Sequence, residues 1–501
     1  MSSTIVRWSW LWLPMAFFIL GLSWAITSPV GSAPDDDYHL ASIWCAQGDR
    51  DAACLDTGLI PPKFVVASGA INSAFCYATN PNTTGDCANA ELNSTQMFLT
   101  ERLNNVQNLY PGGYYAVHSI FVGPNVERSV FIMRIFNILL TSVLLSLLIR
   151  VAPAGIRQST LLTFIAAFTP LGVFLVASTN PSGWAIVGTL FMAAFGLSLM
   201  HRKEWRSRRT WLIAVGLAIS AAMAITSRVD SSAFTVIAVL MIFLLAGAAR
   251  IKQQWVGALL LAGTAVIGAF TYLLTTPLTG TVSLGSQEQN PDLFWTNLFN
   301  IPYLIQGIVG GWPLGWNDTV IPDVVPVIGL LIVGVLAYVG ISSTWPWKST
   351  AIALAAVALV GLPLIFMQLQ GIAVGEVVQS RYLLPLFSLL MFALLIPRKA
   401  GAQLLINRNA GIAMAISLWF TLNLSWWVNA HRYAMGAGAS FFDVDAAWSF
   451  GLPLLFTAFL VLGSSAIFIA GSFGPSLNAR TPVKRGASQR TKWRRIGDSN
   501  P

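Results

Sequence analysis

The chain has 501 residues and a formal net charge of +9, and 55% of its residues are hydrophobic whereas only 10% are charged. This composition excludes an ordinary soluble domain and is typical of a membrane protein. The positive charge does not require a nucleic-acid partner. The basic tail from Arg480 to Arg495 has no aromatic or motif context, and we expect it to lie near anionic lipid headgroups.

Apolar stretches predict an all-α polytopic membrane protein, because a helix that crosses a bilayer needs about 20 such residues. The first stretch is expected to remain as a helix, since its apolar run from Trp8 to Thr27 exceeds the usual signal-peptide core of about 7–15 residues. About twelve stretches qualify, near residues 9–28, 129–150, 158–178, 182–200, 211–227, 232–249, 256–275, 322–342, 350–369, 382–397, 410–428 and 449–471.

The distribution of charge predicts the orientation. With a cytoplasmic N-terminus, the cytoplasmic side holds most of the 29 Lys and Arg residues but only Glu204 and Asp498 among the 20 acids. This asymmetry favours an even number of crossings with both termini inside. The predicted parts are a first segment (1–28), an extracytoplasmic loop (29–128), helices two to seven (129–275), a Trp-rich extracytoplasmic loop (276–321), helices eight to twelve (322–471) and a basic cytoplasmic tail (472–501).

The four cysteines all fall in the predicted loop 29–128. Paired cysteines belong in an oxidising compartment. Pairs Cys45–Cys54 and Cys76–Cys87 are expected because both close short loops, although four cysteines allow three pairings and the sequence does not choose among them. A zinc site is the alternative, but the spacings match no common zinc pattern.

The same loop opens with Asp35, Asp36 and Asp37, followed by His39. A run of carboxylates at the mouth of a membrane bundle is a candidate site, since it can act as a base or hold a divalent metal. The alternative is a solvated loop in which Asp37 caps a helix that begins near Tyr38. Further along, the stretch Thr95–Leu109 predicts an amphipathic helix.

The second external loop, 276–321, is rich in tryptophan. Trp295, Trp312 and Trp316 are either anchors at the membrane interface or a platform on which sugar rings stack.

Four arginines lie in or beside the apolar segments and can all face the external side. Arg134, Arg228, Arg381 and Arg432 are either paired internally, as Arg228 would be with Asp230, or form a phosphate clamp. The second interpretation is favoured for Arg381, and the first for Arg134 and Arg432.

Several short elements, in this order, resemble those of a large bacterial family of multi-pass proteins of unknown function that is grouped with the GT-C glycosyltransferases. The elements are Asp35-Asp36-x-x-His39, Pro111 to Tyr115, Arg134 with Asn137, Asn180-Pro181 and Arg381-Tyr382-x-x-Pro385. The chain departs from the family pattern at Asp36, Ser182 and Ser380 and within the Pro111 element, which leaves the roles of these positions open.

The resemblance implies a GT-C-like fold and transfer of a sugar from a polyprenyl-phosphate donor to a glycan or lipid acceptor outside the cytoplasm of a bacterium. It implies that Asp35 or Asp36 is the base and that Arg381, His39 and Arg134 bind the donor phosphate. Tyr114, Tyr115, Tyr382, Asn180 and Arg228 are the further candidates for substrate binding. Asp35 and Asp37 could hold Mg²⁺ or Mn²⁺, whereas a hydrogen-bonded base needs no metal.

Two other functions fit the same sequence. A transporter or flippase for lipid-linked saccharides should carry polar groups through the depth of the membrane, whereas the charges here gather at one face. A non-catalytic envelope assembly protein is the third possibility, since some of the family positions have changed.

Overall fold

The structure is a computed structural model that describes residues 9–51, 53–168, 170–202, 204–275, 292–446 and 448–477. The predicted N-terminal end, the first part of the Trp-rich loop and most of the basic tail lie outside the described residues.

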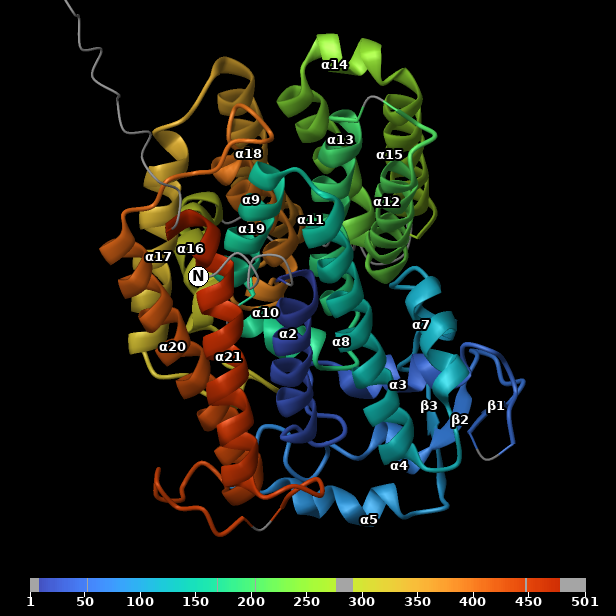
Figure 1. Ribbon diagram of the computed structural model, residues 1–501. Coiled ribbons are helices and arrows are strands. Elements are labelled where there is room, and N and C mark those ends of the chain that lie inside the picture. Colours follow the sequence, from blue (N-terminus) through green and yellow to red (C-terminus); the bar gives the residue numbers. More distant parts are fainter. Residues whose placement is uncertain are drawn as a thin grey trace, which may run out of the picture.

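The described chain is mainly helical (Figure 1). The long helices follow the apolar stretches, and short elements fill the loop between the first two of them. The helices are α2 (Ser9–Ile26), α3 (Asp36–Cys45), α4 (Ser68–Ile71), η1 (Gly85–Ala88), α5 (Asn89–Leu92), α6 (Asn104–Gln107), α7 (Gly113–His118), η2 (Ser119–Phe121), α8 (Val126–Val151), α9 (Ala154–Ala167), α10 (Leu171–Val176), α11 (Ser182–Met200), α12 (Arg208–Ser227), α13 (Val229–Ala246), α14 (Ala248–Gln253), α15 (Trp255–Thr275), α16 (Leu293–Gln306), the π-turn η3 (Gly307–Gly311), α17 (Val324–Ile341), α18 (Pro346–Gln370), α19 (Ser380–Leu395), α20 (Arg408–Met435) and α21 (Leu454–Leu477).

Ten of the described helices are long and apolar enough to cross a membrane, where the sequence predicted about twelve. The other two predicted segments are shorter helices that pack inside the bundle. The stretch 158–178 divides into α9 and α10 next to Pro170, because proline cannot continue the hydrogen-bond pattern of a helix. The segment 382–397 corresponds to α19, which has 16 residues.

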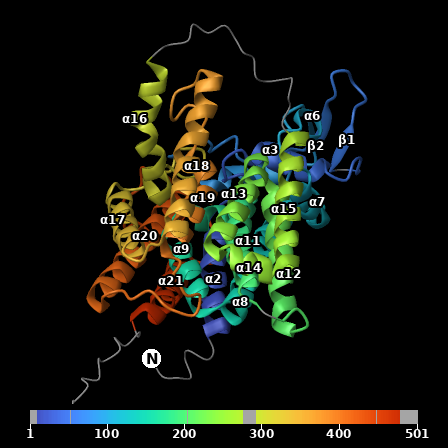
Figure 2. The same cartoon turned by 90° about the horizontal axis from the view of Figure 1, so that it is seen from above.

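Helix α11 runs through the centre of the bundle, and all its residues are buried (Figure 1). It packs against α12 and α13 on one side and against α9 and α19 on the other. Figure 2 shows α16 standing beside α18. A helix that is apolar all round is expected in such a central position.

The segment between α2 and α8 forms a small domain at one end of the bundle. It contains an antiparallel sheet of β1 (Cys54–Asp56), β2 (Phe64–Ala67) and β3 (Met97–Thr100), in the order β1-β2-β3. The predicted amphipathic helix Thr95–Leu109 is wrong, because its first half pairs with β2 as strand β3. Its second half holds only the single turn α6, which ends at Asn108 in the left-handed conformation.

Two disulfides fix this domain, and both were predicted. Cys45, at the end of α3, binds Cys54 at the start of β1, and Cys76 binds Cys87. The first therefore ties the helix that carries the acidic residues to the sheet. No cysteine in the described chain is free.

Candidate functional site

Asp35, Asp36 and Asp37 are the last residues of a segment that leads from α2 into α3, which we call the acidic segment (residues 28–37). Its backbone carbonyls accept hydrogen bonds from six side chains that come from six different parts of the chain. The pairs are Ser28 and Pro29 with Arg134, Val30 with the Tyr77 hydroxyl, Gly31 with the Trp316 indole, Ser32 with the Tyr433 hydroxyl, and Pro34 with Asn180 and Arg381. Donors that converge in this way hold the segment in one shape, as a preorganised site requires.

The backbone of this segment bends through two left-handed residues. Gly31 has φ of +84°, and a Cβ atom there would lie 2.8 Å from the Ser73 hydroxyl oxygen. Asp35 has φ of +58° although it is not a glycine. Non-glycine residues in this region store strain and persist where the surroundings fix them, often at functional sites. The hydrogen bonds to Pro34 supply that constraint next to Asp35.

The Asp35 carboxylate lies between two arginines. Its oxygens accept hydrogen bonds from Arg381 at 2.5 Å and from Arg102 at 3.1 Å, and its side chain is 35% exposed, whereas Arg381 is 3% exposed. Burial raises the pKa of Asp35, but the charge of Arg381, its hydrogen bond and the charge of Arg102 together lower the pKa below its usual value. The carboxylate is therefore ionised at neutral pH and reachable from outside.

Behind Asp35, two buried arginines flank one tyrosine ring. The guanidinium carbon of Arg228 lies 4.2 Å from the centre of the Tyr382 ring, and that of Arg381 lies 4.9 Å from it. Arg228 also forms a two-bond ion pair with Asp230 and approaches the Tyr110 ring. This arrangement places two guanidinium groups where α12, α13 and α19 begin or end. Asp230 balances the charge of Arg228, whereas Arg381 is balanced by the partly exposed Asp35, whose place an anionic ligand could take.

His39 lies in the first turns of α3 with its ring among tyrosines. Its Nδ1 atom is 3.0 Å from the Tyr115 hydroxyl, and its ring meets that of Tyr110 edge to face. The Nε2 atom is buried and has no hydrogen-bond partner in the described chain. Burial, with the nearby arginines, lowers the pKa of His39 to about 3, so the ring is neutral and can donate at most one hydrogen bond.

Asp36 points inward and is fully buried. Its oxygens accept hydrogen bonds from the Ala33 backbone at 3.1 Å and the Thr179 hydroxyl at 3.0 Å. Asn180, next to Thr179, donates to the Pro34 carbonyl, and its side-chain oxygen accepts from the backbone N–H of Ser182 at the start of α11. Thr179 and Asn180, which directly precede α11, therefore hold the acidic segment in position. The predicted cap by Asp37 is wrong, because α3 begins at Asp36 and Asp37 binds Arg102 at 2.6 Å.

Three sequence candidates lie away from Asp35. Arg134 directs its two terminal nitrogens at the carbonyls of Ala25, Ser28 and Pro29 near the end of α2. Tyr114 stacks on His118 within the bundle, 3.9 Å between ring centres. Arg432 binds Asp318 and three carbonyls of the Cys76–Cys87 loop. The hydrogen bonds and ring contacts of Arg134, Tyr114 and Arg432 therefore connect different elements of the fold.

The arrangement of Asp35 and Asp37 does not fit a metal cage. The guanidinium group of Arg102 hydrogen-bonds to both carboxylates, so a cation already bridges them. The described residues contain no group of three or more His, Cys, Asp or Glu side chains that could hold a metal ion.

Sequence reasoning missed Arg102 and Tyr110. Arg102 follows strand β3, whose pairing brings it across to α3, and the local sequence carries no sign of that pairing. Tyr110 directly precedes the Pro111 element and could have been included with Tyr115. Trp312 and Trp316 direct their indole N–H groups to Asn317 and Gly31, whereas Trp295 is exposed on α16.

The ten long apolar helices define a polytopic membrane protein. A family profile described as "Predicted membrane protein (DUF2142)" matches residues 18–391, so the chain belongs to this family. The matched region extends from α2 to α19 and includes every residue in contact with Asp35. No curated protein and no solved structure matches the chain.

Proposed function

We propose that the protein is a membrane glycosyltransferase that takes a sugar from a polyprenyl-phosphate donor and transfers it to a glycan or lipid acceptor on the extracytoplasmic side. The proposal rests on one observation: a rigidly held, partly exposed carboxylate, Asp35, lies directly against the buried guanidinium of Arg381. These are the two groups that such a transfer needs, a base for the acceptor and a cation for the leaving phosphate.

Arginine suits the phosphate because its planar fork of donors can bind two phosphate oxygens at once. The Nε atom of Arg381 is buried and has no partner in the described chain, so donor capacity remains on this side chain. Arg228, which Asp230 holds in an ion pair, lies across the Tyr382 ring. The neutral His39 ring offers a hydrogen bond without a competing charge.

The proposed reaction is a displacement at the anomeric carbon of the donor sugar. Asp35 accepts the proton of the acceptor hydroxyl while the hydroxyl oxygen bonds to that carbon. The bond from the carbon to the phosphate oxygen breaks, and the polyprenyl phosphate leaves with its negative charge against Arg381. Asp36 is a poorer candidate for the base, because it is fully buried and both of its oxygens already accept hydrogen bonds.

Binding of the donor would also activate Asp35. Arg381 now holds the pKa of this carboxyl below its usual value. A phosphate that takes over the Arg381 guanidinium removes that stabilisation, which raises the proton affinity of the carboxylate at the moment it is needed.

The proposed orientation rests on the distribution of charge in the loops. Arg202 and Arg209 both donate to the carbonyl of Val151, at the end of the bundle opposite the acidic segment. Cationic residues favour the cytoplasmic side. The acidic segment and the disulfides would then face outward.

A lipid-linked saccharide transporter is the second candidate. Its translocation path would need polar groups through the membrane. The central helix α11 is buried throughout and carries no charged residue from Ser182 to Met200, which favours the transferase. A non-catalytic assembly protein would keep the positioning hydrogen bonds but would not depend on the Asp35 carboxylate.

The test is glycan linkage analysis of the envelope in a deletion strain of the source organism. The strain is complemented with wild type, Asp35→Asn or Arg381→Ala, with Asp445→Asn and Arg128→Ala as exposed matched controls. We expect one glycosyl linkage to be lost, and to return with wild type and both controls only. Full restoration by Asp35→Asn at normal protein level would refute the transferase and favour a transporter or assembly role.

A further inference from the structure

Three arginines converge on the end of α8 that lies opposite the acidic segment. Arg157, in the first turn of α9, donates to the Ile149 carbonyl at 3.2 Å. Arg202, which follows α11, and Arg209, in the first turn of α12, donate to one and the same oxygen, the Val151 carbonyl, at 2.6 and 2.9 Å. The three guanidinium groups therefore form one group, which we call the α8 arginine cluster.

The positive charge of this cluster is not balanced. Among the described residues no carboxylate forms an ion pair with any of its three arginines. Glu204 is the one acid in the sequence between Arg150 and Arg209, and it is exposed. The C-terminal end of a helix supplies a charge of only about −0.5. Capping of α8 therefore leaves most of the positive charge without a counter-charge.

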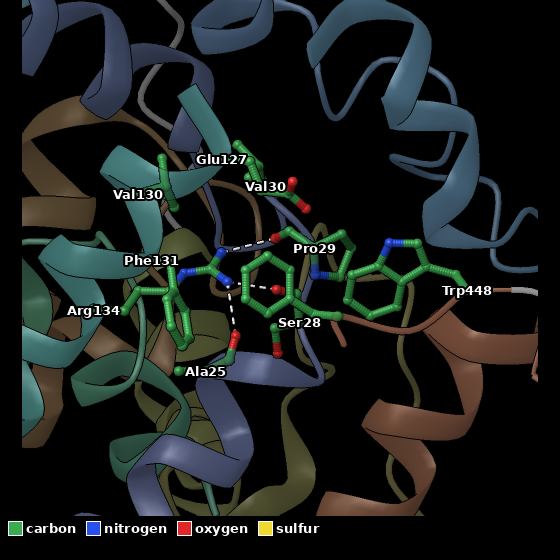
Figure 3. Close-up of a pocket in the computed structure, with 10 residues that line it drawn as sticks. Ala25, Ser28, Pro29, Val30, Glu127, Val130, Phe131, Arg134 and Trp448 are labelled. Atoms are coloured by element: carbon green, nitrogen blue, oxygen red, sulfur yellow. Dashed lines mark hydrogen bonds between the residues drawn. The ribbon is translucent and has the colours of Figure 1, made fainter. Parts of the chain in front are cut away.

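Arg134, near the other end of α8, shows the contrast. Figure 3 shows its single guanidinium directed at the carbonyls of Ala25, Ser28 and Pro29. There one cation is shared by three carbonyls, whereas in the α8 arginine cluster three cations share two carbonyls. The first arrangement satisfies its arginine within the protein, and the second does not.

The arginines of the cluster also repel one another. Burial and the nearby charge of Arg209 lower the pKa of Arg157 and that of Arg202 below the usual value. Like charges on long side chains can move apart into water, but here hydrogen bonds to neighbouring carbonyls of α8 hold them together. A cluster that the fold keeps together against its own repulsion is a preformed site for an anion.

Most of the hydrogen-bond donors in the cluster are unused. A guanidinium group has five N–H donors, and each of the three uses one of them on α8. The Nε atom of Arg202 is buried and has no partner in the described chain, although buried donors are normally paired. Because the planar fork of arginine binds two phosphate oxygens at once, a phosphate group is the anion that suits these donors.

The cluster lies where membrane-spanning helices begin and end. Helix α8 ends at Val151 and α12 begins at Arg208. Beside them the guanidinium carbon of Arg150 lies 4.6 Å from the centre of the Trp10 ring, and tryptophan favours the membrane interface. The ends of spanning helices mark the boundary between the hydrocarbon core and the headgroups. The phosphate groups of lipids occupy this layer.

We propose that the α8 arginine cluster binds a phosphate group, carried by the headgroup of a membrane phospholipid or by a soluble phosphate compound. The bound phosphate places negative charge among three guanidinium groups and connects α8, α9 and α12 at this end of the bundle. The inference is independent of the proposed function, which uses the opposite end.

The test measures dissociation constants for the full chain in an uncharged maltoside detergent, by microscale thermophoresis. The salt concentration is about 0.15 M, which screens attraction between exposed charges more than about 8 Å apart. The probes are short-chain phosphatidylglycerol, diacylglycerol with the same chains, and inorganic pyrophosphate. Diacylglycerol lacks the phosphate and reports binding of the chains alone.

The double variant Arg202→Gln with Arg209→Gln removes two charges of the cluster. Its matched control, Arg206→Gln with Arg208→Gln, removes two exposed charges from the same connection. Arg209→Gln alone is measured as well, because it leaves Arg202 on the Val151 carbonyl and preserves the fold. Arg381→Ala separates this site from the phosphate site proposed beside Asp35.

We expect at least one phosphate probe to bind wild type, Arg381→Ala and the control alike. It should bind the cluster double variant about tenfold or more weakly, with a smaller loss in Arg209→Gln. Binding of phosphatidylglycerol without pyrophosphate assigns the phosphate to a lipid. Binding of pyrophosphate at least as tight as that of phosphatidylglycerol assigns it to a soluble compound.

The inference is overturned if neither phosphate probe binds wild type, or if the cluster variants bind as wild type does. It is also overturned if the control loses as much affinity as the cluster double variant, since the attraction is then diffuse, or if diacylglycerol binds as tightly as phosphatidylglycerol. None of these results touches the linkage test of Asp35 and Arg381, so the proposed function and the cluster can fail separately.

Discussion

Buried arginines hold both ends of the acidic segment, but they hold different partners. At one end Arg134 donates to three backbone carbonyls, which are neutral and cannot be exchanged for a ligand. At the other end Arg381 binds the Asp35 carboxylate, which is partly exposed and can be exchanged for another anion. A buried arginine bound to carbonyls thus stabilises the fold, whereas one bound to an accessible carboxylate can bind a ligand.

Replacing Arg134 is expected to have the largest effect. Arg134→Met keeps much of the side-chain volume but leaves three carbonyls near the end of α2 without their donor. Hydrogen bonds to a charged group contribute about 1.5–3 kcal/mol each, so we expect a loss of roughly 3–5 kcal/mol in stability. The measurement is the apparent Tm of the purified protein. An unchanged Tm with lost activity would instead return Arg134 to the predicted role of phosphate ligand.

Replacing Arg381 should give the reverse pattern. Arg381→Ala removes the cation that faces the leaving phosphate, and loss of such a group typically costs about 10²–10³-fold in rate. The apparent Tm should fall by much less than in Arg134→Met, because Asn180 still donates to Pro34. Transfer rates with a polyprenyl-phosphate sugar in nanodiscs measure the effect, and Arg128→Ala is the control. Equal losses of stability in both arginine variants would remove the distinction between the two ends.

The middle of the acidic segment depends on the Cys76–Cys87 disulfide. Tyr77 follows Cys76 and donates its hydroxyl to the Val30 carbonyl. Disulfides that close short loops typically stabilise by about 2–4 kcal/mol, and we expect a loss of that order in the double variant Cys76→Ala with Cys87→Ala. Unfolding in denaturant measures it. A loss of activity larger than the loss of folded protein would show that Tyr77 also positions Asp35.

The sequence predicted the helices well because apolar length is a local property. All twelve predicted segments coincide with helices, and only the break at Pro170 and the short α19 reduce the number long enough to span. The domain between α2 and α8 was harder to predict, because Met97 to Thr100 form a strand only through pairing with β2. The sequence predicted Asp35 and Arg381 as site residues from separate motifs. Their contact joins residues 346 positions apart, which no local pattern reveals.

The last expected effect concerns Asp36 and its dependence on pH. Burial raises the pKa of this carboxyl from 3.8 to about 6, although Arg134 and two hydrogen bonds act in the opposite direction. The folded protein therefore binds the proton more tightly than the unfolded chain does. Protonated Asp36 therefore contributes to the stability of the folded protein at low pH. This contribution is lost as the pH rises from about 4 to about 6.

At neutral pH the corresponding loss in the free energy of unfolding is of the order of 3 kcal/mol. Asp36→Asn has no proton to lose, so its apparent Tm should exceed that of wild type above pH 6 and converge with it near pH 4. Asp445→Asn, an exposed control, should follow wild type at every pH. A constant difference between Asp36→Asn and wild type would mean that the carboxyl titrates alike in both states. If Asp36→Asn also keeps transfer activity, Asp35 is left as the base, since it is the acid of the pair that an acceptor can reach.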